Sequence, residues 1–309
     1  MEQLTPPVGR FAPTPSGRMH LGNVFSFLMA WLSIRSQGGS IVLRMEDLDT
    51  QRTNAEKAQI LRDDLLWLGL DWDVETPPQS QRSPIYQEFF QKLLEKGLLY
   101  PCYCTRNQLH SVNAPHLSDG TYLYPGTCRN LTDEKRAEFH RSPAWRIKVP
   151  DRLWRVEDLL QGEYTENLIS DCGDFLVRRS DGMFVYQLAV TVDDGLSGVT
   201  EVVRGCDLLS SAPRQMYLQE LFGFPHPTYG HIPLLIAPDG RRLSKRDQDT
   251  DLGYLKNCCT PEKILGMLAY ACGLIERNES LSARELVAEF AWEKVQKDPI
   301  CPDLHSLIP

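Results

Sequence analysis

Apolar positions in the first seventy residues alternate between short continuous runs and helical stripes. Val8–Pro13 and Ser40–Met45 are predicted to be short buried strands, because their apolar residues are contiguous and the segments are brief. Gly22–Ser36 repeats apolar side chains at helical spacing and stops at a glycine pair, and Asn54–Leu68 follows the same pattern. This strand–helix–strand–helix order predicts an α/β fold, a parallel sheet with helices on its faces.

The rest of the chain is less regular. Ile85–Lys96 predicts a third helix, and from Tyr100 to about Ser142 the pattern breaks up, which we interpret as an insertion with its own small fold. We expect short strands of a mixed region at Ala144–Val149, Arg155–Asp158 and Phe175–Arg178. Strands that return to the main sheet are expected at Gln187–Asp193, Glu201–Arg204 and Ile232–Ile236. Two helices are expected to follow, at Pro261–Cys272 and Ala283–Lys297.

Composition narrows the class of protein without identifying it. The 309 residues are 42% hydrophobic and 24% charged, which is ordinary for a soluble enzyme. We find no apolar run of about 18 residues and no basic-then-apolar start, so we expect neither a membrane span nor a signal peptide, and a cytoplasmic location. The net charge of −8 weakens a nucleic-acid reading, although a local basic face could still bind RNA. Nine cysteines, an odd number, argue against a disulfide framework.

The segment from Arg10 to Asn23, R-F-A-P-T-P-S-G-R-M-H-L-G-N, has the chemistry of a phosphate site. Its prolines stiffen the backbone and Gly17 permits a tight turn. Gly22 and Asn23 then open a helix, whose N-terminus favours phosphate, and Gly22 would let an adenine ring approach the backbone. His20 could donate to phosphate oxygens in the transition state. The alternative is a proline-rich turn capped by Asn23, with a structural histidine.

A second candidate segment is Arg242-Leu243-Ser244-Lys245-Arg246, which follows a Pro-Asp-Gly turn. In isolation an exposed basic loop is the more common explanation. Its order and separation from the first segment favour a different interpretation, in which the two segments together form a binding site for ATP. Lys245 would then neutralise charge on the departing pyrophosphate.

The two segments resemble the HIGH and KMSKS signatures of class I aminoacyl-tRNA synthetases, in the form used by the glutamyl branch. Asn23 replaces the second histidine of HIGH, which that branch commonly lacks, and Arg242 replaces the first lysine of KMSKS. The resemblance implies that ATP, with Mg²⁺, is a substrate, and that His20 and Lys245 are catalytic. The implied ATP-binding residues are Pro13, His20, Gly22, Asn23, Arg242, Ser244 and Lys245.

Three further segments resemble the amino-acid pocket of that branch: Arg44–Asp49, Tyr186–Asp194 and Val202–Asp207. The resemblance implies that Glu46 binds the substrate ammonium, Tyr186 orients the substrate and Arg204 contacts its carboxylate. Arg10 would pair with the side-chain carboxylate, beside Phe11, Ala12, Pro13 and Thr14. An arginine fork prefers a charged acceptor to an amide, which favours glutamate over glutamine. The plainer alternatives are acids that cap a helix and, at Tyr186–Val190, a core strand.

Cys102, Cys104 and Cys128 supply three of the four ligands of a tetrahedral zinc. With Tyr124 they resemble the C-x-C, then Y-x-x-x-C, zinc pattern of the glutamyl-queuosine tRNA(Asp) synthetases and of some bacterial glutamyl-tRNA synthetases. His110, His116 and Tyr122 remain competitors for the fourth position, since histidine is the more ordinary ligand. The alternative is three unligated thiols.

The resemblance runs from Val8 to Leu274 and implies a Rossmann-like catalytic domain with a zinc-containing insertion and a short C-terminal helical domain. The corresponding parts are residues 1–99, the insertion 100–142 within a larger one reaching about residue 184, residues 185–246, and 247–309. Residues 247–309 leave no room for the large anticodon-binding region of a glutamyl-tRNA synthetase. We therefore expect a monomer that activates L-glutamate with ATP, without tRNA, and transfers it to queuosine in the anticodon loop of tRNA(Asp). The alternatives are a minimal glutamyl-tRNA synthetase that charges a tRNA 3′ end, and an inactive RNA-binding paralogue.

Overall fold

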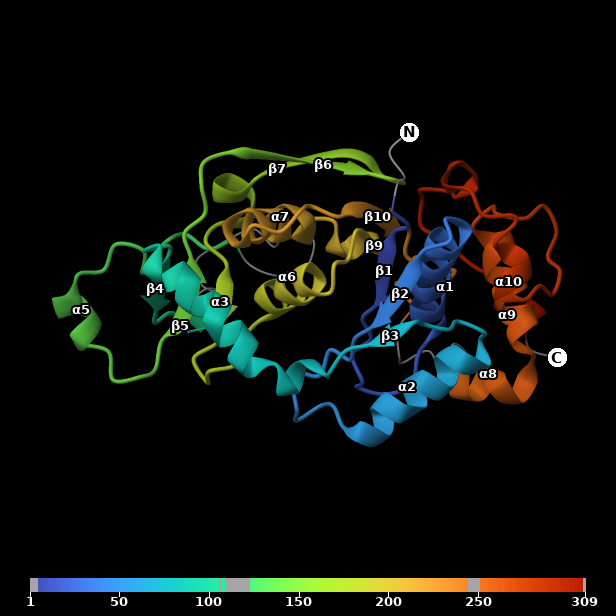
Figure 1. Ribbon diagram of the computed structural model, residues 1–309, viewed down its shortest axis with the longest axis horizontal. Coiled ribbons are helices and arrows are strands. Elements are labelled where there is room, and N and C mark those ends of the chain that lie inside the picture. The colour runs from blue at the N-terminus through green and yellow to red at the C-terminus, as the bar shows by residue number, and fades with distance from the viewer. Residues whose placement is uncertain (1–4, 106, 109–122, 244–250, 308–309) are drawn as a thin grey trace.

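The computed structural model describes residues 5–105, 107–108, 123–243 and 251–307. The molecule is elongated, with the α/β core in the middle, a mixed region at one end and the C-terminal helices at the other (Figure 1). No helix among the described residues is both long enough and apolar enough to cross a membrane.

The first half of the core follows the predicted pattern. Asn54 caps its helix by accepting a hydrogen bond from the Lys57 amide, and Gly38 takes the left-handed conformation that ends the preceding helix. Gly39 is required for packing, because a Cβ there would lie 2.3 Å from the Pro7 carbonyl oxygen. The elements are β1 (Val8–Phe11), α1 (Leu21–Ser36), β2 (Ser40–Leu43), α2 (Ala55–Trp67), β3 (Val74–Glu75) and η1 (Gln79–Gln81).

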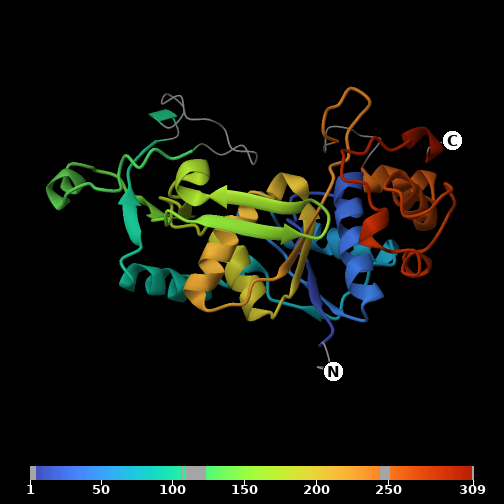
Figure 2. The ribbon, with the colours of Figure 1, turned by 90° about the horizontal axis from the view of Figure 1, so that it is seen from above.

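The middle region consists of one small sheet at the end of the molecule and a hairpin that lies along the core (Figures 1 and 2). Strands β4, β5 and β8 form an antiparallel sheet, and β6 and β7 form a hairpin whose first strand joins the main sheet. The bounds are α3 (Ser83–Glu95), β4 (Leu99–Cys102), α5 (Asp133–Ala137), β5 (Ala144–Ile147), β6 (Leu153–Asp158), β7 (Gly162–Asn167), η2 (Leu168–Cys172) and β8 (Leu176–Arg178).

The second half of the core corrects two predictions. The expected strand at Gln187–Asp193 is a helix, α6 (Tyr186–Leu196), because every residue from Leu188 to Asp194 is buried and an all-round apolar run does not distinguish a helix from a strand. The strand expected at Ile232–Ile236 lies earlier, since Pro233 has no amide to continue the ladder. The remaining elements are β9 (Glu201–Gly205), η3 (Cys206–Leu208), α7 (Ser211–Phe222) and β10 (Thr228–Ile232).

The C-terminal segment packs into the same hydrophobic core as β1 and α1. Its second expected helix is wrong in extent, because α10 ends at Leu286 and the chain continues through turns and a short 3₁₀ segment. The elements are α8 (Leu252–Cys258), α9 (Pro261–Ala271), α10 (Ala283–Leu286), η5 (Trp292–Lys294) and η6 (Leu304–Ser306).

The two halves of the core meet at β1 and β9. Strands β1 and β2 pair in parallel, as do β9 and β10. The Thr200 amide donates to the Val8 carbonyl, and the Arg10 side chain reaches the Val203 carbonyl, so β9 lies beside β1 and runs the same way. The chain therefore leaves β1 toward β2 on one side and has β9 on the other. In open α/β sheets, such a reversal of strand order opens a crevice at the carboxyl ends of the strands, where ligands bind.

Candidate active site

A cavity of about 330 Å³ opens at this reversal point, between the carboxyl ends of β1, β9 and β10 and the start of α1. It brings together residues from both ATP segments and from the amino-acid segments, from Arg10 to Leu243. The expected site residues that line it are Arg10, Ala12, Thr14, His20, Gly22, Asn23, Glu46, Tyr186, Arg204 and Arg242.

Two expected residues, Phe11 and Pro13, are placed differently. Phe11 has no exposed surface and packs its ring 5.3 Å from that of Phe27, so its side chain belongs to the core rather than to a glutamate pocket. Pro13 lines a smaller neighbouring pocket, which it shares with Thr14 and His20. Ser244 and Lys245 lie outside the described residues.

His20 and Asn23 close the N-terminus of α1 reciprocally. The Gly22 amide donates to His20 Nδ1 at 3.1 Å, and the His20 amide donates to Asn23 Oδ1 at 3.2 Å. Because Nδ1 accepts, neutral His20 carries its proton on Nε2, which is then a hydrogen-bond donor. A Cβ on Gly22 would lie 2.9 Å from the His20 ring, so this glycine also makes room for the histidine.

The first ATP segment is also tied to α8, the helix that follows the second ATP segment. The Leu252 amide, at the start of α8, donates to the Met19 carbonyl at 2.9 Å. Asp64 is buried on α2 and pairs with both Lys256 of α8 and, at 3.6 Å, Arg18. A buried carboxylate thus ties Arg18 of the first segment to α8, the helix that follows the second segment.

Arg10 lies at the cavity wall and is 6% exposed. Its Nη1 donates to the Val203 carbonyl at 2.8 Å, and its Nε lies 3.9 Å from Asp194. Burial lowers the pKa of Arg10, against the opposing charge of Asp194, and the charges of Arg204 and Arg44 lower it further. A buried cation whose charged form is disfavoured by burial and by neighbouring cations is stabilised by an anionic ligand.

Glu46 follows β2 and faces the same cavity. Arg44 Nη2 donates to it at 3.0 Å. Burial raises the pKa of Glu46, and the Arg44 charge only partly offsets this. A bound ammonium group would favour the ionised form of Glu46.

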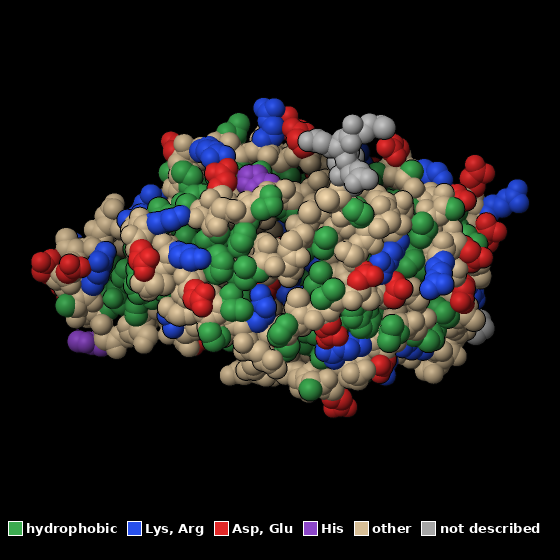
Figure 3. All heavy atoms as spheres, viewed as in Figure 1, with side chains coloured by type: hydrophobic (Ala, Val, Ile, Leu, Met, Phe, Trp, Pro, Cys, Tyr) green, Lys and Arg blue, Asp and Glu red, His purple; other side chains and the backbone are tan. Residues whose placement is uncertain are grey.

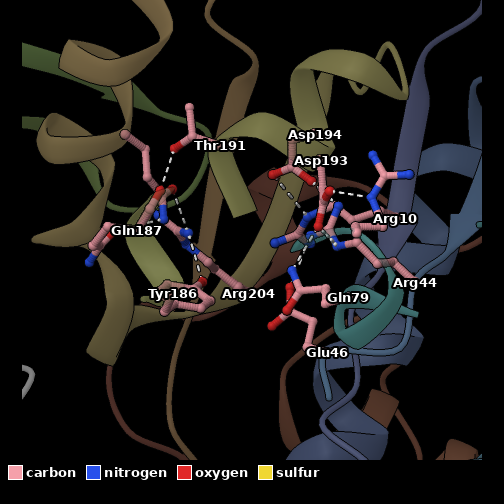
Figure 4. Close-up of polar contacts among 12 residues, drawn as sticks. Arg10, Arg44, Glu46, Gln79, Tyr186, Gln187, Thr191, Asp193, Asp194 and Arg204 are labelled. Carbon is pink, nitrogen blue, oxygen red and sulfur yellow. Dashed lines mark hydrogen bonds and ion pairs between the residues drawn. The ribbon is translucent and has the colours of Figure 1, made fainter. Parts of the chain in front are cut away.

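Arg44 anchors a buried charge network that the sequence did not reveal. It has no exposed surface, and it pairs with Asp194 at 2.6 Å and with Asp193 at 3.7 Å (Figure 4). Asp193 also accepts from Gln79 and Arg82, at 2.8 and 2.7 Å. Asp193 and Asp194 belong to α6, the helix that was predicted as a strand. Through them α6 holds Arg44, and with it the Arg44–Asp49 segment, in place.

Arg204 forms the other wall of the cavity. Its Nη1 donates to Gln215 at 2.8 Å and lies 3.4 Å from the Tyr186 hydroxyl (Figure 4). Its Nε donates to His231 at 2.9 Å, and His231 in turn contacts Asp158 at 2.5 Å. No sequence signal pointed to His231 or Asp158, which lie in unremarkable strands.

Arg242 lies at the mouth and is paired. Its Nη1 contacts Asp207 at 2.6 Å. The charges of this pair offset each other, so the arginine and carboxylate side chains that remain on the described part of the cavity wall are Arg10, Arg204 and Glu46. Two cations and one anion are the inverse of the charges on free glutamate.

The cysteine cluster lies in the middle region, on β4 and the segment after it. The three sulfur atoms lie within 4.8 Å of one another, and the Cys104 and Cys128 sulfurs are 3.6 Å apart. Zn–S bonds of about 2.3 Å in a tetrahedron require sulfurs about 3.8 Å apart, so the donors fit zinc. The Tyr124 hydroxyl lies 3.5 Å from Cys102 Sγ and 3.9 Å from Cys104 Sγ.

Arg146 supports this cluster. It lies over the Tyr124 ring at 3.7 Å, and its Nε donates to Cys102 Sγ at 3.4 Å. Burial alone would raise the pKa of the Cys102 thiol, but the Arg146 charge brings it below its usual value, which favours a thiolate. The competing ligands His110, His116 and Tyr122 lie outside the described residues.

The face drawn in Figure 3 mixes acidic and basic side chains over all its elements. A single-sign patch therefore does not mark an RNA site on this face.

Comparison with known proteins agrees with this geometry. Residues 8–307 match the model of the catalytic domain of class I tRNA synthetases (E and Q). The chain belongs to this family. A glutamyl-Q tRNA(Asp) synthetase of Symbiobacterium thermophilum is 44% identical over 94% of both chains, and one of Nitratidesulfovibrio vulgaris is 46% identical over 86% of both. A crystal structure of a glutamate tRNA ligase from Elizabethkingia meningosepticum, in complex with its amino acid, superposes with a TM-score of 0.83 at 27% identity.

That superposition covers 98% of this chain and 68% of the ligase. Members of this class I family share the parallel α/β catalytic domain, which is the architecture seen here. The cavity at the β1–β9 junction is therefore the candidate active site of a class I synthetase.

Proposed function

We propose that this enzyme activates L-glutamate with ATP in the absence of tRNA and transfers the glutamyl group to the queuosine base of tRNA(Asp). The observation that carries the amino-acid assignment is the cavity wall, where Arg10, Arg204 and Glu46 complement the two carboxylates and the ammonium group of glutamate. Glutamine lacks the second carboxylate and would leave one buried arginine without an anionic partner.

In the first step a carboxylate oxygen of glutamate attacks the α-phosphorus of ATP, and pyrophosphate leaves. Arg10 and Arg204 would fix the carboxylates, Glu46 the ammonium group and Tyr186 the position of the substrate. His20 Nε2 would donate to a phosphate oxygen at the helix N-terminus, beside Gly22, Asn23 and Pro13, and Mg²⁺ would accompany the nucleotide. Lys245, with Arg242 and Ser244, would neutralise the departing pyrophosphate.

The acceptor assignment is supported by the relatives. The match covers 94% of the glutamyl-Q tRNA(Asp) synthetase of Symbiobacterium thermophilum and 86% of that of Nitratidesulfovibrio vulgaris, whereas the superposition covers 68% of the glutamate tRNA ligase. Queuosine lies in the anticodon loop, so the catalytic domain itself would bind that loop. We propose that the enzyme works as a monomer in the cytoplasm, where its tRNA is found.

We further propose one structural zinc per chain, held by Cys102, Cys104, Cys128 and Tyr124. Its role would be to hold β4 and the chain at Tyr124–Cys128 together, in a small region whose described core consists of little more than the ligands themselves. It would take no part in adenylate formation, since the cluster lies outside the cavity lining.

Labelling of purified tRNAs tests the function. The protein is incubated with ATP, labelled glutamate and either tRNA(Asp) containing queuosine, tRNA(Asp) lacking it, or tRNA(Glu). We expect label only on the first. Label on tRNA(Glu) alone would establish the minimal glutamyl-tRNA synthetase instead, and absence of glutamate-dependent pyrophosphate exchange would indicate an inactive paralogue.

A further inference from the structure

His231 is a fully buried histidine that contacts Arg204 but does not line the cavity. It lies on β10 directly opposite Arg204 of β9 in the strand register, so the two side chains are on the same face of the sheet. Its Nε2 accepts from Arg204 Nε at 2.9 Å, and its Nδ1 lies 2.5 Å from Asp158 Oδ2.

These contacts locate the proton on the ring. A guanidinium Nε–H only donates, so His231 Nε2 must be unprotonated and the proton of the neutral ring lies on Nδ1. Nδ1–H then donates to Asp158. Burial, with the charge of Arg204 acting in the same direction, lowers the pKa of His231 to about 4, although Asp158 opposes the shift.

Asp158 is held so that only one of its oxygens faces the ring. Its Oδ1 accepts from the backbone amides of Leu160, Gln161 and His231, at 2.9 to 3.1 Å. Its Oδ2 is left for His231. The side chain cannot rotate without giving up three hydrogen bonds.

The partners of Arg204 are all uncharged: His231, Gln215 and the Tyr186 hydroxyl. Its Nη2 makes no hydrogen bond within the described part of the chain. These partners orient the guanidinium but do not neutralise its charge. The carboxylate of Asp158 contacts His231 and not Arg204 itself.

We propose that Asp158 and His231 are positioning residues for glutamate recognition: Asp158 holds His231 in the Nδ1–H tautomer, and the Nε2 lone pair then sets the direction of the Arg204 guanidinium toward the substrate carboxylate. This rests on the role proposed above for Arg204. It extends that function by two residues that contact neither glutamate nor ATP.

Asp158→Asn tests the tautomer directly. The amide oxygen would stay with the three backbone amides, which turns Nδ2–H toward His231 Nδ1. Nδ1 would then have to accept, the proton would move to Nε2, and Nε2–H would face Arg204 Nε–H. We expect the KM for glutamate in pyrophosphate exchange to rise about 10- to 100-fold, with the KM for ATP changed less than about twofold.

Variants of His231 separate tautomer from packing. In H231Q the side-chain oxygen can replace Nε2 as the acceptor, so we expect a glutamate KM within about threefold of the native value. H231L keeps a similar volume but has no acceptor, and should match Asp158→Asn. Glutamine has no tautomers, so in the double variant D158N/H231Q the substitution of Asp158 should no longer raise the glutamate KM above that of H231Q alone. Glu157→Gln, an exposed neighbour on β6, is the matched control.

The proposal fails if D158N leaves the glutamate KM unchanged, or raises it equally in the native and H231Q backgrounds, because Asp158 would then act only as a cap for the following loop. If D158N does not fold by circular dichroism, the His231 pair decides: equal KM values for H231Q and H231L overturn the proposal. Failure of the proposed function looks different, since native protein would then show no glutamate-dependent exchange at all.

Discussion

Replacing Asp193 with asparagine removes the centre of the buried charge network. The carboxylate is 1% exposed and accepts from Gln79, Arg82 and Tyr86 at 2.7 to 2.8 Å, while Arg44 Nε lies 3.7 Å away. Burial, together with Asp193, raises the pKa of Tyr86, so its hydroxyl stays a donor. Asparagine keeps one acceptor oxygen and turns an amide toward groups that donate.

The magnitude follows from these contacts. Losing a charge-assisted hydrogen bond costs about 1.5 to 3 kcal/mol, and leaving a buried charge short of its partner brings such losses to about 3 to 5 kcal/mol. Arg44 keeps Asp194 and Glu46, which places D193N toward the lower end. With a urea m-value of about 3 kcal/mol/M, the unfolding midpoint should fall by about 1 M.

Urea unfolding followed by circular dichroism measures this shift. Asp133→Asn is the control, since that side chain is 90% exposed and its loss should move the midpoint by less than about 0.2 M. A D193N shift as small as the control, at an unchanged m-value, would refute the reasoning that this network stabilises the fold.

Three further outcomes are expected. Because burial raises the pKa of Glu46, the glutamate KM should rise as pH falls through that value; E46Q should raise the KM about 10- to 100-fold and remove this pH dependence. Lys245→Ala should slow adenylate formation by about 10²- to 10³-fold with an unchanged melting temperature. Protein purified without added metal should contain one zinc, and C128S should lose it and melt earlier, unlike Cys301→Ser, which changes an exposed thiol.

Each outcome can fail. A raised carboxyl pKa destabilises the fold increasingly as pH rises past the ordinary glutamate pKa, so E46Q should be at least as stable as the native protein at neutral pH; a large loss of stability would mean that Glu46 is structural. Equal activity of Lys245→Ala and native protein would remove the lysine from the mechanism. A stably folded, metal-free native protein would count against zinc.

The sequence predicted the first half of the core because its signals are local. Asn54 and the glycines after α1 mark element ends by their own chemistry, whatever the rest of the fold does. Helix α6 could not be recognised in this way. It is covered on all sides by the sheet region, α3 and α7, so its apolar run has no polar face to show a helical period.

The same difference between local and long-range signals separates the site residues that were predicted from those that were not. Residues within recognisable motifs, such as His20 and Glu46, were predicted and line the cavity. Arg44 and Asp194 lie 150 positions apart, and Arg204 and His231 meet only because β9 pairs with β10. Such partners depend on strand pairing, which one sequence does not reveal.

The placement of the acids is consistent with the proposal that this cavity selects an anionic amino acid. Apart from Arg242, which pairs with Asp207, two arginines line the described cavity wall, yet the nearest carboxylates behind them, Asp194 and Asp158, do not line it. Asp194 lies 3.9 Å from Arg10, and Asp158 reaches Arg204 only through a neutral histidine. Acids in direct contact at the wall would compete with substrate carboxylates for the same donors. In the proposed function, the acids behind the arginines orient the cations and leave their charge to the ligand. Glu46, which also accepts from Arg44, is then the acid on the described wall that is assigned to the substrate ammonium, since Asp207 pairs with Arg242.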